Sequence, residues 1–270
     1  NSLEEISITD CLAGCDLPYQ NKLGTIGSGN HFAELQSIDR VYNQDAFQAL
    51  GLDSDEVLLL VHSGSRTYGD YILNKFIREN HCQKGLFVGS EGFTGYLAEH
   101  DRALNYASLN RELIALRIMR AMNINTHRKL LDSVHNSITV KMIGGENFYI
   151  HRKGASPSDQ GFLVVAGTRD SNSYIVEPAP DLGEYNYSVS HGAGRKWPRN
   201  HCKERLGKMY SRRQRGHLPF IRSLIYRDEN HLYQEAPEAY KQIEQVIEDM
   251  VNHGMIRLVA SLKPMVTIKV

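Results

Sequence analysis

The 270-residue sequence has little cysteine, no long apolar run and no net charge. Its four cysteines lack the Cys-x-x-Cys spacing of a zinc site, and so few cysteines predict a reducing, cytoplasmic location. No apolar stretch approaches membrane-spanning length, and the first residues lack the basic start and apolar stretch of a signal peptide. The 31 basic and 31 acidic residues balance, which excludes a uniformly basic nucleic-acid coat. The composition therefore predicts a globular protein without a membrane partner.

Basic residues are nevertheless concentrated between Arg195 and Arg215, where Glu204 is the only acid. This segment fits either a local phosphate-binding surface or a solvated face, and charge alone leaves both open. Cys11 and Cys15 have the spacing of ligands on one helix face, but buried small residues are the simpler interpretation.

Helix-like and strand-like segments alternate along the chain, which predicts an α/β fold, with α+β as the alternative. The apolar run Val57–Val61 predicts a buried strand that delivers His62 at its end. Helical spacing is found in Ala103–Met122, in Thr126–Val134 and in Glu238–Val251, which contains apolar residues on one face. The remaining strand-like segments are Phe148–His151, Phe162–Ala166, Ser173–Val176, Ile256–Leu262 and Met265–Val270.

Four histidines lie in small or polar surroundings. His31 follows Gly-Ser-Gly-Asn, a tight loop; His62 precedes Ser-Gly-Ser-Arg; His135 precedes an asparagine; and His191 precedes Gly-Ala-Gly-Arg. Imidazole is a common metal ligand and a competent nucleophile, and glycine lets a phosphate approach the backbone. Each histidine alone fits an ordinary satisfied polar residue. Together they predict a site for metal and phosphate.

Several motifs of nucleotide and metal enzymes are missing. The sequence contains no Gly-x4-Gly-Lys-Ser/Thr loop, no His-Glu-x-x-His and no Lys-x-Asp-Gly, the lysine-nucleophile motif of ordinary nucleotidyl-transferring ligases. If the chain transfers nucleotides, histidine is the candidate nucleophile.

Four segments carry a resemblance to a known family: Gly24–Glu34, His62–Arg66, Asn147–Ala155 and His191–Arg195. In this order they resemble the signatures of the RtcB family, the GTP- and manganese-dependent RNA ligases, and the likeness runs along essentially the whole chain. The resemblance implies one RtcB-like ligase domain over residues 1–270. It also implies RNA as the partner, joined at a 3′-phosphate or 2′,3′-cyclic phosphate end to a 5′-hydroxyl end, in RNA repair or tRNA splicing. An activating protein and the oligomeric state stay open.

The resemblance also implies a role for individual residues. His191 would be the nucleophile that becomes guanylylated, His31 and His62 would bind one Mn²⁺, and His135 would bind a second. Glu34 and Lys269 would read guanine edges, and Tyr240 would stack on the base; the alternatives are a core aromatic for Tyr240 and an ordinary terminal lysine for Lys269. The complete nucleotide-binding set is Asn30, Glu34, Asn136, Thr168, Ser173, Gly192, Ala193, Gly194, Tyr240 and Lys269. The residues expected to face RNA or phosphate are Arg66, Arg195 and Arg199.

The sequence departs from the family pattern in three places. The Asp-x-x-Cys metal-binding segment expected near the start has no match, so we expect an N-terminal portion to be missing from this sequence. Ala166–Ser173 contains Arg169 and Asp170 where the family usually has Pro-Gly-Ser-Met-Gly-Thr-Ala-Ser, and the chain between His151 and His191 is short. With these changes the sequence resembles a divergent bacterial branch of the family, the branch that is coupled to release factor H.

Two other functions remain open at this point: a metal-dependent phosphodiesterase and a non-catalytic RNA-binding relative. His191 with its Gly-Ala-Gly-Arg sequence favours the ligase over the phosphodiesterase, because hydrolysis needs no covalent histidine.

Overall fold

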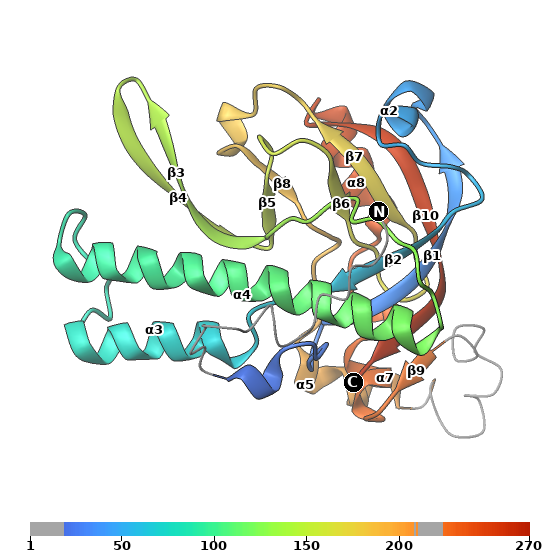
Figure 1. The fold of residues 1–270 in the computed structure, drawn as a ribbon, viewed down its shortest axis with the longest axis horizontal. Helices are drawn as coiled ribbons and strands as arrows, with labels where there is room; N and C mark the ends of the chain where they lie inside the picture. The colour runs from blue at the N-terminus through green and yellow to red at the C-terminus, as the bar shows by residue number, and fades with distance from the viewer. Residues whose placement is uncertain (1–18, 208, 210–223) are drawn as a thin grey trace. The chain divides into compact units, whose positions relative to one another are not determined.

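The computed structural model describes residues 19–207, 209 and 224–270 (Figure 1). The chain divides into two compact units, one of Asn1–Gly27 and Val61–Lys129, the other of Ser28–Leu60 and Leu130–Val270. Cys11 and Cys15 lie outside the described residues, and so do the basic residues between 208 and 223. The expectation of one domain over residues 1–270 stays a prediction. Among the described residues, no helix combines the length and the apolar character needed to cross a membrane.

The first unit is built on two long helices, α3 (Thr67–Asn80) and α4 (Glu91–Ala121), preceded by the short η1 (Gln20–Lys22). They pack through a core that includes Ile72 of α3 and Leu113 of α4. The predicted helix Ala103–Met122 is confirmed as the second half of α4. Its first half went unpredicted because glycines and polar residues interrupt the apolar spacing there; the Ser90 side chain caps its start by accepting from Phe93 N.

The second unit is built on a six-stranded sheet with the order β2-β1-β10-β7-β6, and β9 pairs with β10. Its long central strands are antiparallel, and Glu34 of β1 lies opposite Thr267 of β10. Mixed sheet and helix confirm the predicted α/β class. The strands are β1 (Phe32–Val41), β2 (Val57–His62), β6 (Leu163–Val165), β7 (Ser173–Pro178), β9 (Leu224–Tyr226) and β10 (Ile256–Lys269).

The sheet changes two of the strand predictions. The strand at Val57–Val61 is confirmed and extends to His62, but its predicted burial is wrong, because β2 is an edge strand and Val57 is exposed. The two predicted C-terminal strands are one continuous strand, β10. Pro264 lies within it at a register shift, where the missing N–H of proline is tolerated.

Two helix predictions also change. Thr126–Val134 forms no helix, because Leu130 and Leu131 pack one after the other against the core cluster around Phe47. The predicted helix Glu238–Val251 begins only at Ile243. Pro237–Ala239 forms a separate 3-10 turn, η4, and Tyr240 follows it in extended backbone.

Two small antiparallel sheets and several short helices complete the unit. The β3–β4 hairpin contains the predicted strand Phe148–His151. The bounds are β3 (Asn136–Ile143), β4 (Glu146–Lys153), β5 (Ala155–Pro157), β8 (Ser188–Ser190), α2 (Gln44–Ala49), η2 (Gly183–Tyr185), α5 (Arg199–Leu206), α7 (Asn230–Gln234) and α8 (Ile243–Asn252).

Candidate histidine and nucleotide site

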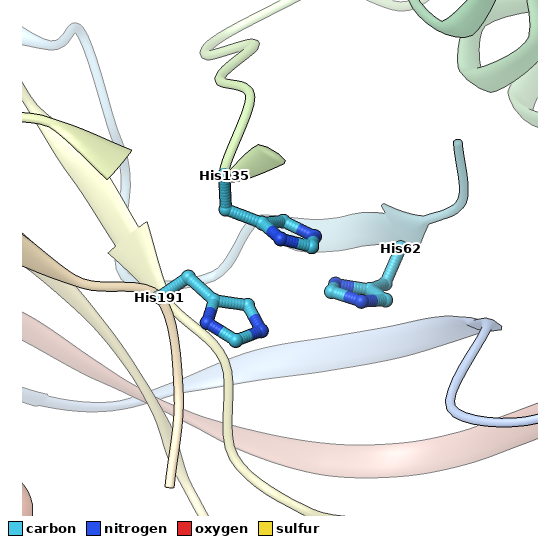
Figure 2. A group of neighbouring side chains, drawn as sticks. All are labelled: His62, His135 and His191. Carbon is cyan, nitrogen blue, oxygen red and sulfur yellow. The ribbon is translucent and has the colours of Figure 1, made fainter. Parts of the chain in front are cut away.

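Three of the four predicted histidines come together. His62 is the last residue of β2 and so belongs to a strand of the large sheet, His135 directly precedes β3, and His191 directly follows β8. Figure 2 shows their rings turned toward one another, and each offers a ring nitrogen within 4.8 Å of the others. The rings of His135 and His191 stack with centroids 4.1 Å apart. The fourth histidine, His31, is not in this group; it lies immediately before β1.

A hydrogen bond to the backbone of Gly154 helps to orient the His191 ring. Its Nδ1 lies 2.7 Å from the backbone oxygen of Gly154. Because a carbonyl oxygen only accepts, Nδ1 must carry the proton, and Nε2 is left with an unshared electron pair. Burial lowers the pKa of His191 below the usual histidine value, and the Gly154 carbonyl opposes this shift only in part. The ring is therefore neutral near pH 7, with Nε2 unprotonated.

Gly154 connects two of the histidines through its backbone. Its N–H donates to the carbonyl of His135 at 2.7 Å and to Asn136 Oδ1 at 3.0 Å, while its carbonyl also accepts from the backbone N–H of His191. Its φ is +75°, and a Cβ at this position would lie 3.3 Å from His191 Cε1. Sequence reasoning assigned Gly154 no role, although it lies inside one of the matched motifs. The signal that could have identified Gly154 was its position between two strands.

The predicted glycine loop before His31 is confirmed as a turn with positive φ at Gly27 and Gly29. A Cβ at Gly27 would overlap the guanidinium of Arg66, whose Nε donates to Thr25 Oγ1 at 3.3 Å. Burial lowers the pKa of Arg66. Arg66 therefore packs on this loop through the space that glycine leaves open.

Polar side chains lie buried in the large sheet where the sequence predicted base-reading residues. One carboxylate oxygen of Glu34 accepts from Gln36 Nε2 at 2.7 Å, and the other accepts from the hydroxyl of Thr267. Gln36 Nε2 also lies 3.0 Å from Ser173 Oγ. The carboxylate of Glu34 is thus held in one orientation by donors from β1 and β10.

Lys269 lies near this carboxylate at the end of β10. Its Nζ donates to the backbone carbonyls of Gly29 at 3.2 Å and of His31 at 3.1 Å. Burial raises the pKa of Glu34 to about 7 even though Lys269 and two hydrogen bonds oppose the shift. Burial likewise lowers the pKa of Lys269 to about 8. Desolvation outweighs the mutual attraction of this pair, so both groups change charge close to neutral pH.

A second buried carboxylate organises the segment after His191. Glu235 is almost fully buried and accepts from Arg195 Nη1 at 3.2 Å, from Arg199 Nε at 3.1 Å and from the hydroxyl of Tyr240. Burial and the adjacent Glu235 charge raise the pKa of Tyr240 well above its usual value. Sequence reasoning missed Glu235, because no local pattern distinguishes it from the neighbouring acids.

Arg195 makes a complete set of hydrogen bonds inside the protein. Its five N–H groups have five acceptors: Trp197 O, Glu235 Oε1, Tyr240 Oη, Gln234 O and Cys202 Sγ. Its guanidinium also lies 4.8 Å from the centre of the Tyr240 ring. The contacts of Arg195 therefore fix Tyr240 to the segment that follows His191.

The backbone around His191 is tied to two other segments. Ala166 N donates to the carbonyl of His191 at 2.9 Å, and Lys241 N donates to the carbonyl of Gly194 at 3.0 Å. Gly192 and Ala193 are buried, whereas Gly194 is exposed.

The divergent loop after Ala166 is also anchored. Thr168 and Ser171 bond to each other through their hydroxyls at 2.9 Å, and Gly167 N donates to Ser173 Oγ. The buried Arg169 donates to the carbonyl of Leu232 at 2.7 Å, which ties the loop to α7.

The chain matches the family model of the tRNA-splicing ligase RtcB over residues 13–270. The chain belongs to the RtcB family. The resemblance carried by the four motifs is thereby confirmed.

Several RtcB proteins are similar to this chain. The RNA-splicing ligase RtcB2 of Escherichia coli is 42% identical over 252 residues, which cover 93% of this chain and 66% of that protein. The RNA-splicing ligase RtcB of Mycobacterium tuberculosis is 30% identical, covering 92% and 65%. The tRNA-splicing ligase RtcB of Methanococcus maripaludis is 28% identical, covering 92% and 60%. The chain thus spans slightly less than two thirds of the length of these relatives. Coupling to release factor H and an activating protein stay predictions.

Within this RtcB-family chain the predicted residues fall into distinct groups. His62, His135 and His191 form the histidine group, while Glu34, Ser173 and Lys269 belong to the large sheet. Asn136 is exposed at the start of β3, and Asn30 is half-buried before His31. The binding role of each of these residues stays a prediction.

Proposed function

We propose that this protein is a GTP- and Mn²⁺-dependent RNA ligase that joins a 3′-phosphate or 2′,3′-cyclic phosphate end to a 5′-hydroxyl end through guanylylated His191. The observation that carries the proposal is the hydrogen bond from His191 Nδ1 to the Gly154 carbonyl, because it leaves Nε2 unprotonated beside two further imidazoles. Membership of the RtcB family supports RNA ligation as the reaction.

In the first step, the lone pair of His191 Nε2 attacks the α-phosphorus of GTP. A nitrogen–phosphorus bond forms as the bond from the α-phosphorus to the bridging oxygen breaks, and pyrophosphate leaves. Nδ1 keeps its proton throughout. The Gly154 carbonyl, 2.7 Å away, stabilises the positive charge that develops on the ring.

In the following steps an oxygen of the RNA 3′-phosphate attacks the same phosphorus, the nitrogen–phosphorus bond breaks, and GMP passes to the RNA. The RNA 5′-hydroxyl then attacks the 3′-phosphate and displaces GMP, which completes the phosphodiester. A 2′,3′-cyclic phosphate is first opened by water to give the 3′-phosphate.

The histidine group fits a divalent metal ion. Imidazole nitrogens are suitable ligands for first-row metals, and the three nitrogens are close enough to surround one ion. The resemblance assigns His31 and His62 to one Mn²⁺ and His135 to a second. Because His62 and His135 lie together beside His191, our proposal places both on one ion there and leaves His31 to contribute to a second ion. A bound Mn²⁺ would neutralise charge on the phosphate oxygens.

The nucleotide would lie against the buried carboxylates. Glu34 and Lys269 would bind the polar edge of guanine, since their buried groups are already oriented by neighbouring donors and acceptors. The ring of Tyr240 would stack on the base, held by Glu235 and Arg195.

The other predicted residues would contact the nucleotide or the RNA, and Asn30 and Asn136 would hold the nucleotide phosphates. Thr168, Ser173, Asn30, Asn136 and the Gly192–Gly194 backbone complete the proposed nucleotide set, with Arg66 and Arg199 toward RNA. Arg195 has protein acceptors for all its N–H groups, so its part in the proposal is to position Tyr240.

The test is incubation with GTP labelled at the α-phosphate, in the presence of Mn²⁺, followed by a denaturing gel. We expect label that is acid-labile and alkali-stable, is lost in His191→Ala and is kept in His253→Ala, a control at an exposed histidine. Metal binding without label on the unmodified protein would overturn the ligase proposal. In that case, metal-dependent phosphodiester hydrolysis would identify a phosphodiesterase, and RNA binding alone would identify a non-catalytic relative.

A further inference from the structure

The β3–β4 hairpin has two faces of different character. Residues paired across an antiparallel hairpin share a face, and successive pairs alternate between faces. The inner face contains the pairs Ser137–Arg152, Thr139–Ile150, Lys141–Phe148 and Ile143–Glu146. The outer face contains the pairs Asn136–Lys153, Ile138–His151, Val140–Tyr149 and Met142–Asn147.

The inner face packs on the rest of the second unit. Lys141 Nζ donates to Asp159 Oδ2 at 2.7 Å. Arg152 is buried and donates to Ser188 Oγ at 2.8 Å and to the carbonyl of Tyr187 at 3.0 Å. These bonds determine which face of the hairpin is turned away from the protein body.

The outer face is apolar at its far end and basic at its near end. Val140 is 53% exposed and Met142 is 73% exposed. Lys153 and His151 lie at the other end and are also exposed. The eight residues of this face include no acid.

The near end of this face adjoins the histidine group. Asn136 directly follows His135, and Lys153 directly precedes Gly154, whose carbonyl holds His191. Figure 1 shows the hairpin extending away from the large sheet of its unit. The outer face is therefore a strip that starts at His135 and runs outward.

We propose that this outer face binds single-stranded RNA and leads its phosphate end to His191. Unpaired bases stack on aromatic side chains such as Tyr149, which pairs with Val140 on this face, and lysine contacts the backbone phosphates. Exposed Val140 and Met142 extend the apolar surface beside Tyr149, and an acid-free strip does not repel the RNA backbone. The inference rests on the proposed function, since it takes RNA as the substrate.

The hairpin offers matched controls on its own inner face. Val140→Glu and Met142→Glu place a charge on the outer face, whereas Ile143→Glu and Phe148→Glu place the same charge on the inner face near the tip. The control positions are 40% and 46% exposed, so neither substitution buries the new carboxylate. Thermal melting of each variant checks that the hairpin substitutions leave the protein folded.

The measurement is the affinity for a fluorescent ten-nucleotide RNA with a 3′-phosphate, followed by anisotropy. Stacking of one base on an aromatic side chain contributes about 1–3 kcal/mol, equivalent to roughly 5- to 150-fold in affinity, and the substitutions place a carboxylate on the same face as Tyr149. We expect the outer variants to bind at least about tenfold more weakly and the inner variants to stay within about threefold of the unmodified protein. A trinucleotide should be less sensitive to Met142→Glu, because it is too short to reach the far end.

Three results would overturn the proposal: unchanged RNA affinity in the outer variants, equal weakening in all four variants, or a changed oligomeric state in Met142→Glu with unchanged RNA binding. The last result would identify the face as a protein interface. Labelling with GTP separates this proposal from the ligase itself, since all four variants should label normally. The unmodified protein could fail to become labelled by GTP while the outer variants still bind RNA more weakly than it does. In that case the ligase proposal fails and the proposal of an RNA-binding face is supported.

Discussion

Replacing Glu34 by glutamine tests the electrostatics of the buried sheet directly. Glu34 is 2% exposed, and burial raises its pKa from 4.5 to about 7. An acid with a raised pKa binds its proton more tightly in the folded protein than in the unfolded chain. Its contribution to stability is therefore fully present below pH 4.5 and is lost as the pH rises toward 7.

The size of the effect follows from these two values. They differ by about 2.5, and each pKa unit corresponds to about 1.4 kcal/mol, so ionisation of Glu34 costs roughly 3 kcal/mol of stability by pH 7.5. Glutamine is neutral throughout this range. It also keeps an oxygen that accepts from Gln36, and its amide group can donate to Thr267. We therefore compare the free energy of unfolding of Glu34→Gln with that of the unmodified protein. We expect this difference to be about 3 kcal/mol more favourable to Glu34→Gln at pH 7.5 than at pH 4.5.

Urea denaturation at both pH values measures this difference. Glu248→Gln, at an exposed position of α8, serves as the control and should show little change in relative stability between the two pH values. A difference for Glu34→Gln that is the same at pH 4.5 and 7.5 would refute the reasoning, because the carboxyl would then ionise equally in both states. The variant should also lose GTP labelling if the carboxyl reads the base.

Three further substitutions test the contacts that hold the site. Gly154→Ala should reduce labelling of His191 at least about tenfold, whereas Gly161→Ala, at a similar positive φ with open space around it, should label normally; equal labelling by both would contradict this. Asn110→Ala should lower the free energy of unfolding by about 2–4 kcal/mol in urea, because it leaves buried backbone N–H groups without an acceptor; a loss below about 0.5 kcal/mol would contradict this. Glu235→Gln should destabilise the protein by about 2–4 kcal/mol at pH 7, since it leaves two arginines facing a neutral amide, and an unchanged urea midpoint would contradict the role of this carboxylate.

Local patterns predicted several elements correctly. The helical spacing of Leu109, Leu113 and Leu116 gave the second half of α4, and the apolar run before His62 gave a strand, although not its place at the edge of the sheet. The helix predicted from the spacing of Thr126–Val134 is wrong, because the adjacent residues Leu130 and Leu131 both pack against the core in a segment that is not helical. A helix would have turned these adjacent side chains about 100° apart.

The candidate site likewise contains some residues that the sequence identifies and others that it does not. His62, His135 and His191 are recognisable because glycine and small polar residues surround them in the sequence. Gly154 and Glu235 act through contacts with residues far away in the chain, 37 positions for Gly154 to His191 and 40 for Glu235 to Arg195. Such contacts follow from strand pairing and loop packing, which one sequence without its fold does not specify.

The stacking of His135 on His191 adds a reason why the proposed covalent bond would be short-lived. Guanylylation at Nε2 makes the His191 ring cationic while Nδ1 keeps its proton. The centroid of the His135 ring lies 4.1 Å from that of His191. Metal binding would withdraw electron density from the His135 ring, so His135 would stabilise the cationic His191 ring less well. The Gly154 carbonyl, which accepts from Nδ1, would stabilise the same charge. In the proposed mechanism the two contacts would oppose each other: Gly154 would favour formation of the nitrogen–phosphorus bond, and His135 would favour its cleavage when the RNA phosphate attacks.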